Sequence, residues 1–375
     1  MSAAAGLTVA NIYYNQPMLE RMHAEVSGSL VTYVPTATQM GYAIGLLLLV
    51  PLGDLVERRR LIMLQCLGLA FALAAVAAAK GGALILAASL AVGLMASVAQ
   101  QIVPFAASLA PAEKRGGVVG TVMAGLLCGI LLSRTLAGFV AEHLGWREMF
   151  WLAVPLALLT AALVRVSLPH SKPDHGGHTY SALLRSLGSL WSEFPQLRVA
   201  TYIQCCQFAA FSIFWTVLSL RLEARFDMGP QIAGLFGVLG VMGVMAAPIS
   251  GRIADAGGPR KAVAAGAVLT AISWVVFGLW DSLVGTIVGV LVLDFAVQAS
   301  QISNQSIIYA LRPEARSRIN TVYMTSMFVA GGLGSAGAMM AWHNFGWTGV
   351  TVLGLAVSLV GLALQPLSLR FATKA

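Results

Sequence analysis

The chain has 375 residues, of which 58% are hydrophobic and only 10% are charged, and its mean hydropathy is +0.81. Because soluble domains carry about a quarter charged residues, this composition excludes an ordinary soluble enzyme and indicates a membrane protein. The net charge of +8 does not require a nucleic-acid partner, because in a membrane protein the loop that holds each charge matters more than the sum.

Apolar stretches long enough to cross a bilayer recur along the whole chain. About 20 mostly apolar residues suffice for a spanning helix, and neither an open sheet nor the alternating pattern of barrel strands fits these stretches. The sequence therefore predicts an all-α polytopic membrane protein with twelve transmembrane helices, at about 1–19, 31–53, 61–79, 83–110, 117–141, 147–168, 197–220, 230–251, 262–280, 283–311, 319–342 and 345–369.

The distribution of Lys and Arg predicts the orientation. With the N-terminus inside, the inner loops and the C-terminal tail hold 17 basic residues and the outer loops hold 5, while Arg134 lies within a span. Basic residues concentrate in cytoplasmic loops. We therefore expect a multi-pass protein of the cell inner (plasma) membrane with cytoplasmic N- and C-termini. We expect it to contact the lipid bilayer and no nucleic acid.

Unusual residues recur at one offset of 201 residues. Asp54 then meets Asp255, Arg59 meets Arg260, Gln100 meets Gln301, and the pair Gly145, Trp146 meets Gly346, Trp347. The repeat predicts two pseudo-symmetric six-helix halves, residues 1–168 and 197–375, in the same orientation because six is even. A cytoplasmic linker at 169–196 joins them. Its three histidines suggest either a metal site or, as we favour, a flexible solvated segment.

Polar side chains within the spans are candidates for a cargo cavity. Asp294, Gln298, Gln301 and Gln305 follow each other at steps of 4, 3 and 4, which places them on one face of a helix. The other polar or aromatic candidates are Asn11, Tyr14, Asn15, Gln39, Ser97, Gln100, Gln204, Phe208, Phe211 and Trp215. The alternative is that these side chains only bond helices to one another.

No enzyme signature competes with this interpretation. The sequence has no HExxH, GxSxG or P-loop lysine motif, and its four cysteines lie inside predicted spans without metal-ligand spacing. We expect no enzymatic activity, no cofactor and no metal. A nucleotide-driven pump would need a soluble motor domain, so the energy should come from an ion gradient or from the substrate.

Two six-helix halves, each with a basic loop between its second and third helices, resemble the major facilitator superfamily of secondary transporters along the whole chain. The loop "GRIADAGGPRK" keeps the family signature in Gly251, Asp255, Gly258 and Arg260. The loop "VPLGDLVERRR" keeps Asp54, Arg58 and Arg59 but has Val50 and Glu57 where the glycines would stand. The resemblance implies a gate that closes the cytoplasmic side; the alternative is that these arginines only anchor the topology.

The segment "GILLSRTLAG" lies where proton-coupled antiporters of the family carry Gly-Pro followed by Gly-Gly. Its small residues Gly129, Ser133, Ala137 and Gly138 should let the fifth helix approach a neighbour closely. The Pro position, however, holds Arg134. The opening "ANIYYNQPML" is similar to a bacterial branch of drug-efflux and sugar-efflux-like members.

The resemblance implies a monomeric transporter that moves a small molecule by alternating access, with a cavity lined by helices 1, 4, 7 and 10. We expect proton-coupled efflux; an uptake symporter or facilitator, and a membrane sensor or scaffold that does not transport, are the alternatives. Asp294 and Arg134 break the repeat, since Gly93 and Ser335 stand at the equivalent positions. A charge at the bilayer centre costs roughly 2.5 to 3.5 kcal/mol on insertion scales, so both charges need compensation. We predict that Asp294 carries the proton and that Arg134 biases its ionisation; the alternative is a static charge pair that only orders the helices.

Overall fold

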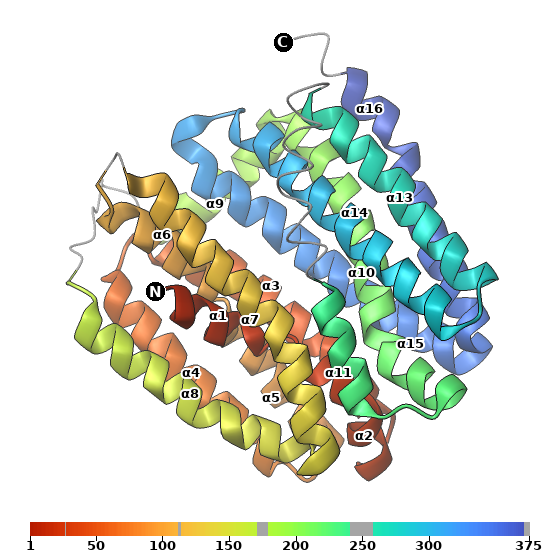
Figure 1. Cartoon of the computed structure of the whole chain (residues 1–375). Coiled ribbons are helices and arrows are strands. Elements are labelled where there is room, and N and C mark those ends of the chain that lie inside the picture. Colours follow the sequence, from red (N-terminus) through yellow and green to blue (C-terminus); the bar gives the residue numbers. More distant parts are fainter. Residues whose placement is uncertain (27, 112–113, 171–178, 241–257, 371–375) are drawn as a thin grey trace. The chain divides into compact units, whose positions relative to one another are not determined.

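The computed structural model describes residues 1–26, 28–111, 114–170, 179–240 and 258–370, and the elements in these ranges are helices (Figure 1). The predicted all-α class is therefore confirmed. The α-helices are α1 (Ser2–Ala10), α2 (Asn15–Glu25), α3 (Val34–Leu52), α4 (Arg58–Ala78), α5 (Gly82–Ala96), α6 (Ala99–Leu109), α7 (Arg115–His143), α8 (Trp146–Ser167), α9 (Tyr180–Glu193), α10 (Pro195–Phe226), α11 (Pro230–Leu239), α13 (Pro259–Leu279), α14 (Leu283–Tyr309), α15 (Arg316–Ala363) and α16 (Gln365–Arg370).

Nine helices in the described ranges are long and apolar enough to cross a membrane. One of them, Arg316–Ser368, contains two predicted spans. The backbone leaves helical geometry at Gly346, where φ is +57°, and this break separates the two spans. The first predicted span is divided between α1 and α2. The eighth begins as α11, and its remainder lies outside the described residues.

Two predicted spans are broken helices. The first turns at residues 11–14, where i→i+3 bonds such as that from Tyr13 N to Ala10 O replace the helical pattern. Pro17 explains part of this break: it has no N–H to donate to Tyr13 O, which accepts from Gln16 N instead. The fourth is divided into α5 and α6 by a turn at Ser97 and Val98. The prediction of a single helix is therefore wrong for both of these spans.

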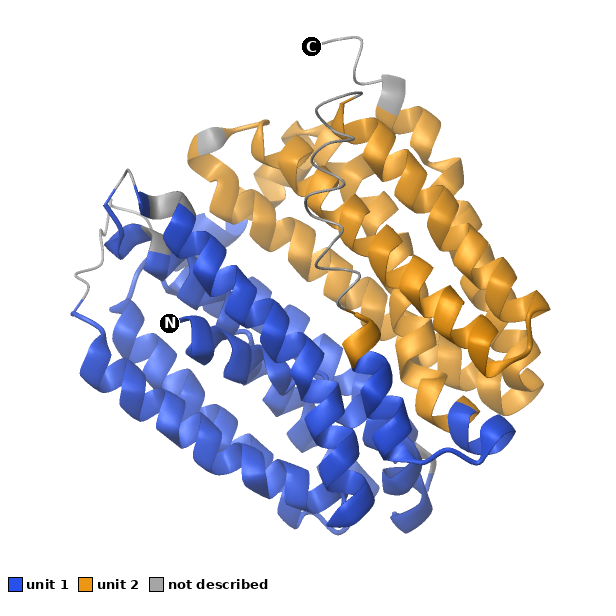
Figure 2. Cartoon of the chain, viewed as in Figure 1, with its two compact units in different colours: residues 1–185, 222–237 blue, residues 186–221, 238–375 orange. Residues whose placement is uncertain are grey.

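Contacts divide the chain into two compact units (Figure 2). Unit 1 is Met1–Arg185 with Leu222–Gly237, and unit 2 is Ser186–Arg221 with Val238–Ala375. The segment Leu222–Gly237 belongs to unit 1 because α11 packs tightly on α7. A Cβ on Gly138 would lie 2.3 Å from the carbonyl oxygen of Pro230, so only glycine permits this approach.

Small residues also bring α7 against α1. A Cβ on Gly129 would lie 2.3 Å from the carbonyl oxygen of Gly6, which is the close packing that lets membrane helices associate without large side chains. The close approach predicted for the fifth helix is thus confirmed at Gly129 and Gly138.

Aromatic side chains fill much of unit 2. Phe214 on α10 stacks on Phe277 of α13 with ring centroids 4.5 Å apart, and Trp274 of α13 lies against Gly354 of α15. These contacts place α13 between α10 and the second half of α15.

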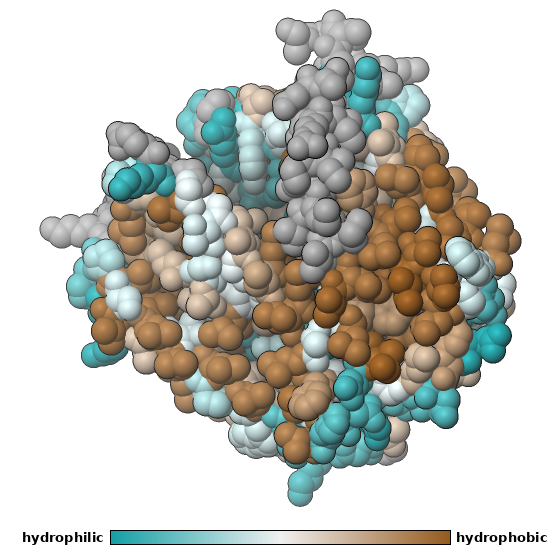
Figure 3. Space-filling view, viewed as in Figure 1, coloured by the Kyte–Doolittle hydropathy of each residue, from teal (hydrophilic) through white to brown (hydrophobic). Residues whose placement is uncertain are grey.

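The described helices expose many large apolar side chains. Figure 3 shows brown, apolar residues covering the visible flanks of the helices and teal, hydrophilic residues gathering near their ends. Phe71, Leu132, Leu333 and Val352 lie within long helices and are exposed by 80, 64, 62 and 62%. Such surface is expected of helices that face lipid.

Part of the segment predicted as a solvated linker is a helix. In α9, Leu183, Leu187 and Leu190 share one face and are buried, while Arg185 and Ser189 are exposed. Leucine at this helical spacing favours an amphipathic helix over a flexible coil, so the expectation of a flexible linker is wrong for residues 180–193. His175 and His178 lie outside the described residues.

Candidate functional site

Arg134 lies at the break between α1 and α2. It is 3% exposed, and its Nε donates to Oε1 of Gln16 at 2.8 Å. The guanidinium carbon lies 4.5 Å from the centre of the Tyr13 ring, close enough for a cation–π contact. The polar amide and the ring thus stabilise a charge that would be costly in lipid.

The predicted residues Asn11, Tyr14 and Asn15 belong to the same break and are buried. Asn11 donates from Nδ2 to Leu7 O at 2.8 Å and to Thr8 O at 3.1 Å, two carbonyls that the turn would otherwise leave without helical partners. Asn15 donates to the hydroxyl of Thr38 on α3 at 3.0 Å, beside the buried Gln39. Asn11 and Asn15 thereby hold the break in unit 1.

A polar network surrounds the second break. Ser97 lies in the turn between α5 and α6, and its hydroxyl accepts from Gln65 Nε2 at 3.4 Å. Gln101 donates to Gln65 Oε1 at 2.6 Å and to Leu49 O at 3.1 Å. The predicted Gln100 is only half-buried, whereas its neighbour Gln101, which we did not predict, is buried.

Asp294 lies on α14 in unit 2 and is 5% exposed. Its Oδ1 accepts from Nε1 of the buried Trp215 on α10 at 3.2 Å. The structure therefore brings together two predicted residues that are 79 positions apart. An indole N–H can only donate, so Oδ1 of Asp294 is the acceptor in this bond.

A row of aromatic rings leads along α10 to this carboxylate. Phe208 stacks on Phe211 with centroids 5.6 Å apart, and Phe211 lies 6.0 Å from Trp215. Phe328 of α15, which we did not predict, contacts Phe208 at 5.1 Å. The three predicted aromatic residues thus form one continuous apolar wall in unit 2.

The predicted glutamines of unit 2 divide into two groups. Gln204 is fully buried and accepts from Nδ2 of Asn304 at 3.4 Å, and Gln305 donates to Asn320 at 3.4 Å, so both tie helices together. Gln298 and Gln301 are half-buried on α14. Gln207, a buried residue one helical turn from Gln204, was missed, although its i, i+3 spacing was a usable signal.

The first basic loop forms a compact structure at the end of α3. Arg58 donates to Oδ1 of Asp54 at 2.8 Å and to Gly53 O at 3.0 Å, and Arg59 donates to Leu168 O at the end of α8 at 2.9 Å. Glu57, which stands at a signature glycine position, accepts from Arg60 N and so caps α4.

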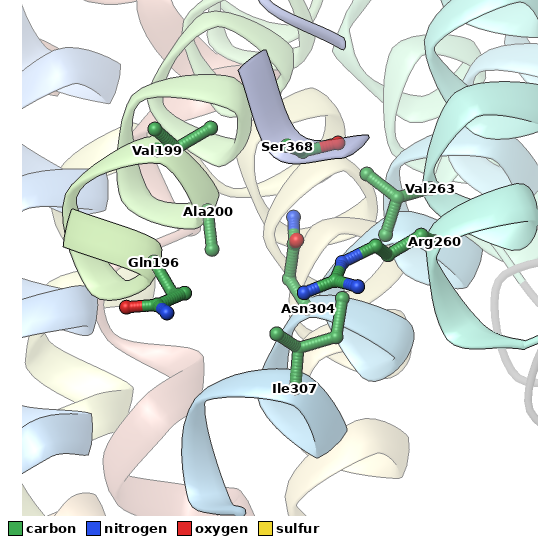
Figure 4. A pocket seen from close by; sticks show the side chains of 8 residues that line it. All are labelled: Gln196, Val199, Ala200, Arg260, Val263, Asn304, Ile307 and Ser368. Atoms are coloured by element: carbon green, nitrogen blue, oxygen red, sulfur yellow. The ribbon is translucent and has the colours of Figure 1, made fainter. Parts of the chain in front are cut away.

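Only part of the second basic loop is described, since Gly251 and Asp255 lie outside the described residues. Gly258 directly precedes α13 and has φ of +84°, a conformation that favours glycine. Arg260 lines a small cavity of unit 2 (Figure 4) with Gln196, Val199, Ala200, Val263, Asn304, Ile307 and Ser368. Its free volume of about 20 Å³ suits about one water molecule, which is too little for an organic cargo.

Comparison with known proteins identifies the architecture. The model of the Major Facilitator Superfamily matches residues 1–335 and 200–372. A putative uncharacterized transporter, YgaY, of Escherichia coli K12 is 42% identical over 369 residues, which cover 96% of this chain and 93% of the relative. A probable transporter, SCO4007, of Streptomyces coelicolor is 32% identical over 96% of this chain and 85% of the relative.

Solved structures agree at the level of the fold. A bacterial homologue of the human lysosomal transporter Spinster, in an inward-facing and unoccupied conformation, has a TM-score of 0.75 at 13% identity over 98% of this chain and 95% of that chain. The D-xylose-proton symporter has a TM-score of 0.73 at 17% identity over 96% and 95%. The predicted fold of twelve transmembrane helices is confirmed, and the chain belongs to the Major Facilitator Superfamily of membrane transporters.

Proposed function

We propose that this transporter exports a small, partly apolar molecule by alternating access and that proton uptake at Asp294 drives the export. The observation that carries the proposal is the buried carboxylate of Asp294, held by Trp215 Nε1 at the end of the aromatic wall. An ionisable group inside a membrane span is costly, and such groups are therefore rare there and commonly have a function. The equivalent position of the other half is Gly93, so the repeat itself does not require an acid there.

In this proposal, unit 1 contributes the positive charge and unit 2 the titratable acid. Arg134 biases Asp294 towards ionisation in one state of the cycle. Substrate binding or closure changes that bias and releases the proton. The half-buried Gln298 and Gln301, together with Phe208 and Phe211, supply polar and apolar contacts to cargo.

We further propose that the protein lies in the inner membrane as a monomer with both termini in the cytoplasm. The excess of basic residues in the loops on the side of Arg58–Arg60 supports this orientation. The similarity of the opening segment to drug-efflux and sugar-efflux-like members supports export over uptake.

The experiment begins with a thermal-shift screen of small molecules on purified protein at two pH values, because a specific ligand stabilises the folded state. Wild type and Asp294→Asn are then reconstituted in liposomes with the identified ligand. We expect the variant to lose accumulation driven by an imposed pH gradient but to retain exchange at equal pH. Accumulation at the wild-type level in Asp294→Asn would remove Asp294 from proton coupling.

The same assay tests the gate. Asp54→Asn should lower the exchange rate, because it weakens the ion pair with Arg58 that closes the loop after α3. Arg60→Gln is the matched control, since the Arg60 backbone N–H, not its side chain, makes the described bond to Glu57. Equal rates for Asp54→Asn and wild type, at equal expression, would leave the loop with a topological role alone.

A further inference from the structure

The helix α9 is the part of the linker that the proposed transport mechanism does not yet use. It has 14 residues and is therefore about 21 Å long. Its first residues, up to Arg185, cluster with unit 1, and its remainder, from Ser186, clusters with unit 2. A continuous helix that belongs to two units must follow one of them if the units move.

The C-terminal end of α9 is fixed to unit 2 by several contacts. Trp191 packs edge-on against Tyr202 of α10 with centroids 5.5 Å apart, and Glu193 forms an ion pair with Arg312, which follows α14. Arg198 donates to Ser192 O at 3.3 Å and so caps the last turn. Phe194 alone separates α9 from α10, which leaves little freedom between the two helices.

The N-terminal end of α9 meets unit 1 through a neutral side chain. The hydroxyl of Tyr180 donates to Leu48 O at 2.8 Å, in the last turns of α3. Loss of solvent raises the pKa of Tyr180, so the hydroxyl keeps its proton and remains a donor. A neutral hydrogen bond contributes little net stability, whereas the other end of α9 combines a charge pair, a ring contact and a cap.

We propose that α9 is a strap that stays with unit 2 throughout the cycle and releases from unit 1 by breaking the hydrogen bond between Tyr180 and Leu48. The inference rests on the proposed alternating access, in which the two halves rock relative to each other. Leu48 lies one turn before the end of α3, next to the loop of Asp54 and Arg58. Release of the strap therefore occurs beside the gate and adds a second contact that must break when that side opens.

Distances between pairs of spin labels test the proposal without a known cargo. The labels are attached in a background where Cys66, Cys128, Cys205 and Cys206 are replaced by Ala. One label at the exposed Ser189 of α9 is paired with Ser317 of unit 2 or with Val166 of unit 1, and a reference pair joins Leu144 of unit 1 to Leu279 of unit 2. Proteoliposomes are measured at pH 5.5 and at pH 8.

We first require that the reference pair shows two distances whose populations change with pH. A single unchanged reference distance would contradict the proposed rocking itself and not the strap alone. Given two reference distances, the pair Ser189–Ser317 should show one constant distance, and the pair Ser189–Val166 should show two. A changing Ser189–Ser317 distance, or a constant Ser189–Val166 distance, would overturn the strap.

The hydroxyl of Tyr180 gives the sharper test. Tyr180→Phe should shift the ratio of the two Ser189–Val166 distances about two- to tenfold towards the longer one, as expected for the loss of one hydrogen bond. Tyr202→Phe is the matched control, because it also removes a tyrosine hydroxyl from the strap region but keeps the ring that contacts Trp191. An unchanged ratio in Tyr180→Phe would show that this bond does not hold the strap.

Discussion

At the scale of single residues, the main feature is the burial of charge within membrane helices. Arg134 and Asp294 are each less than a tenth exposed, and each bonds to a polar atom of its own unit, Gln16 Oε1 and Trp215 Nε1 respectively. Charged hydrogen bonds contribute about 1.5 to 3 kcal/mol, which offsets much of the roughly 2.5 to 3.5 kcal/mol that insertion of such a charge costs. These bonds therefore stabilise two polar side chains that would be costly to bury in lipid without a partner.

Glu20 on α2 gives a pH-dependent prediction outside the predicted spans. Desolvation and the neighbouring Glu223 raise its pKa, with a further increase from Glu142, while Arg21 and His23 lower it. A raised pKa means that the folded state favours the protonated acid, so this contribution to stability is present at low pH and is lost as pH rises through the raised value. Glu20→Gln should therefore raise the melting temperature at pH 8, and the gain should shrink towards pH 4.5.

The measurement is a fluorescence melting curve in detergent at a series of pH values. Glu148→Gln is a suitable control, because it removes a carboxylate at the start of α8 and should not reproduce the pH dependence. A destabilising effect of Glu20→Gln at pH 8 would contradict the prediction.

At the scale of elements, each unit contains a cluster of a Trp, an Arg and a carboxylate that connects different helices. In unit 1, Trp146 Nε1 donates to Glu25 at 2.6 Å, Arg147 pairs with Glu25, and the guanidinium lies 4.2 Å from the Trp146 ring. In unit 2, Arg221 pairs with Asp281 at 2.6 Å and lies 3.8 Å from the Trp347 ring, while Trp347 Nε1 donates to Phe277 O. The two tryptophans are equivalent under the 201-residue repeat, but the arginines and acids come from different positions.

The two clusters should differ in strength because they differ in burial. The two acids are similarly exposed, by 54% at Asp281 and 55% at Glu25, but the Arg221 side chain is only 4% exposed and that of Arg147 is 23% exposed. Exposed pairs contribute about 0 to 1 kcal/mol, whereas a buried charge that loses its partner costs more, because it has no water to replace that partner. Asp281→Asn should therefore lower the melting temperature more than Glu25→Gln.

Melting curves of the two variants at low and high salt would check this order. Salt should weaken the Glu25 pair in wild type more than the Asp281 pair, because screening acts on exposed charges. Equal melting temperatures for Asp281→Asn and wild type would show that the ion pair of Arg221 and Asp281 does not stabilise unit 2.

At the scale of the whole molecule, the orientation follows from where the basic residues lie. We expect the linker and the Arg58–Arg60 loop to be cytoplasmic, since 17 of the basic residues lie on that side and 5 on the other. In intact cells, a thiol reagent that cannot cross the membrane should label a cysteine at the exposed Ala224 and should not label one at the exposed Ser189. Permeabilised cells should show labelling at both, and labelling of Ser189 but not Ala224 in intact cells would reverse the orientation.

The sequence by itself determined the membrane class, the helices and the family, because composition and local hydropathy decide whether a segment crosses a bilayer. The 201-residue repeat also identified the loop in which Asp54 and Arg58 form an ion pair. The sequence did not predict Gln16 as the partner of Arg134, which is 118 positions away. Nor did it predict that the arginines and acids near Trp146 and Trp347 come from positions that are not equivalent under the repeat. It also missed the break before Pro17 and the buried face of α9. Only the tertiary structure decided these features, because hydrogen bonds and packing act between atoms that are close in space, and one sequence records no such distances.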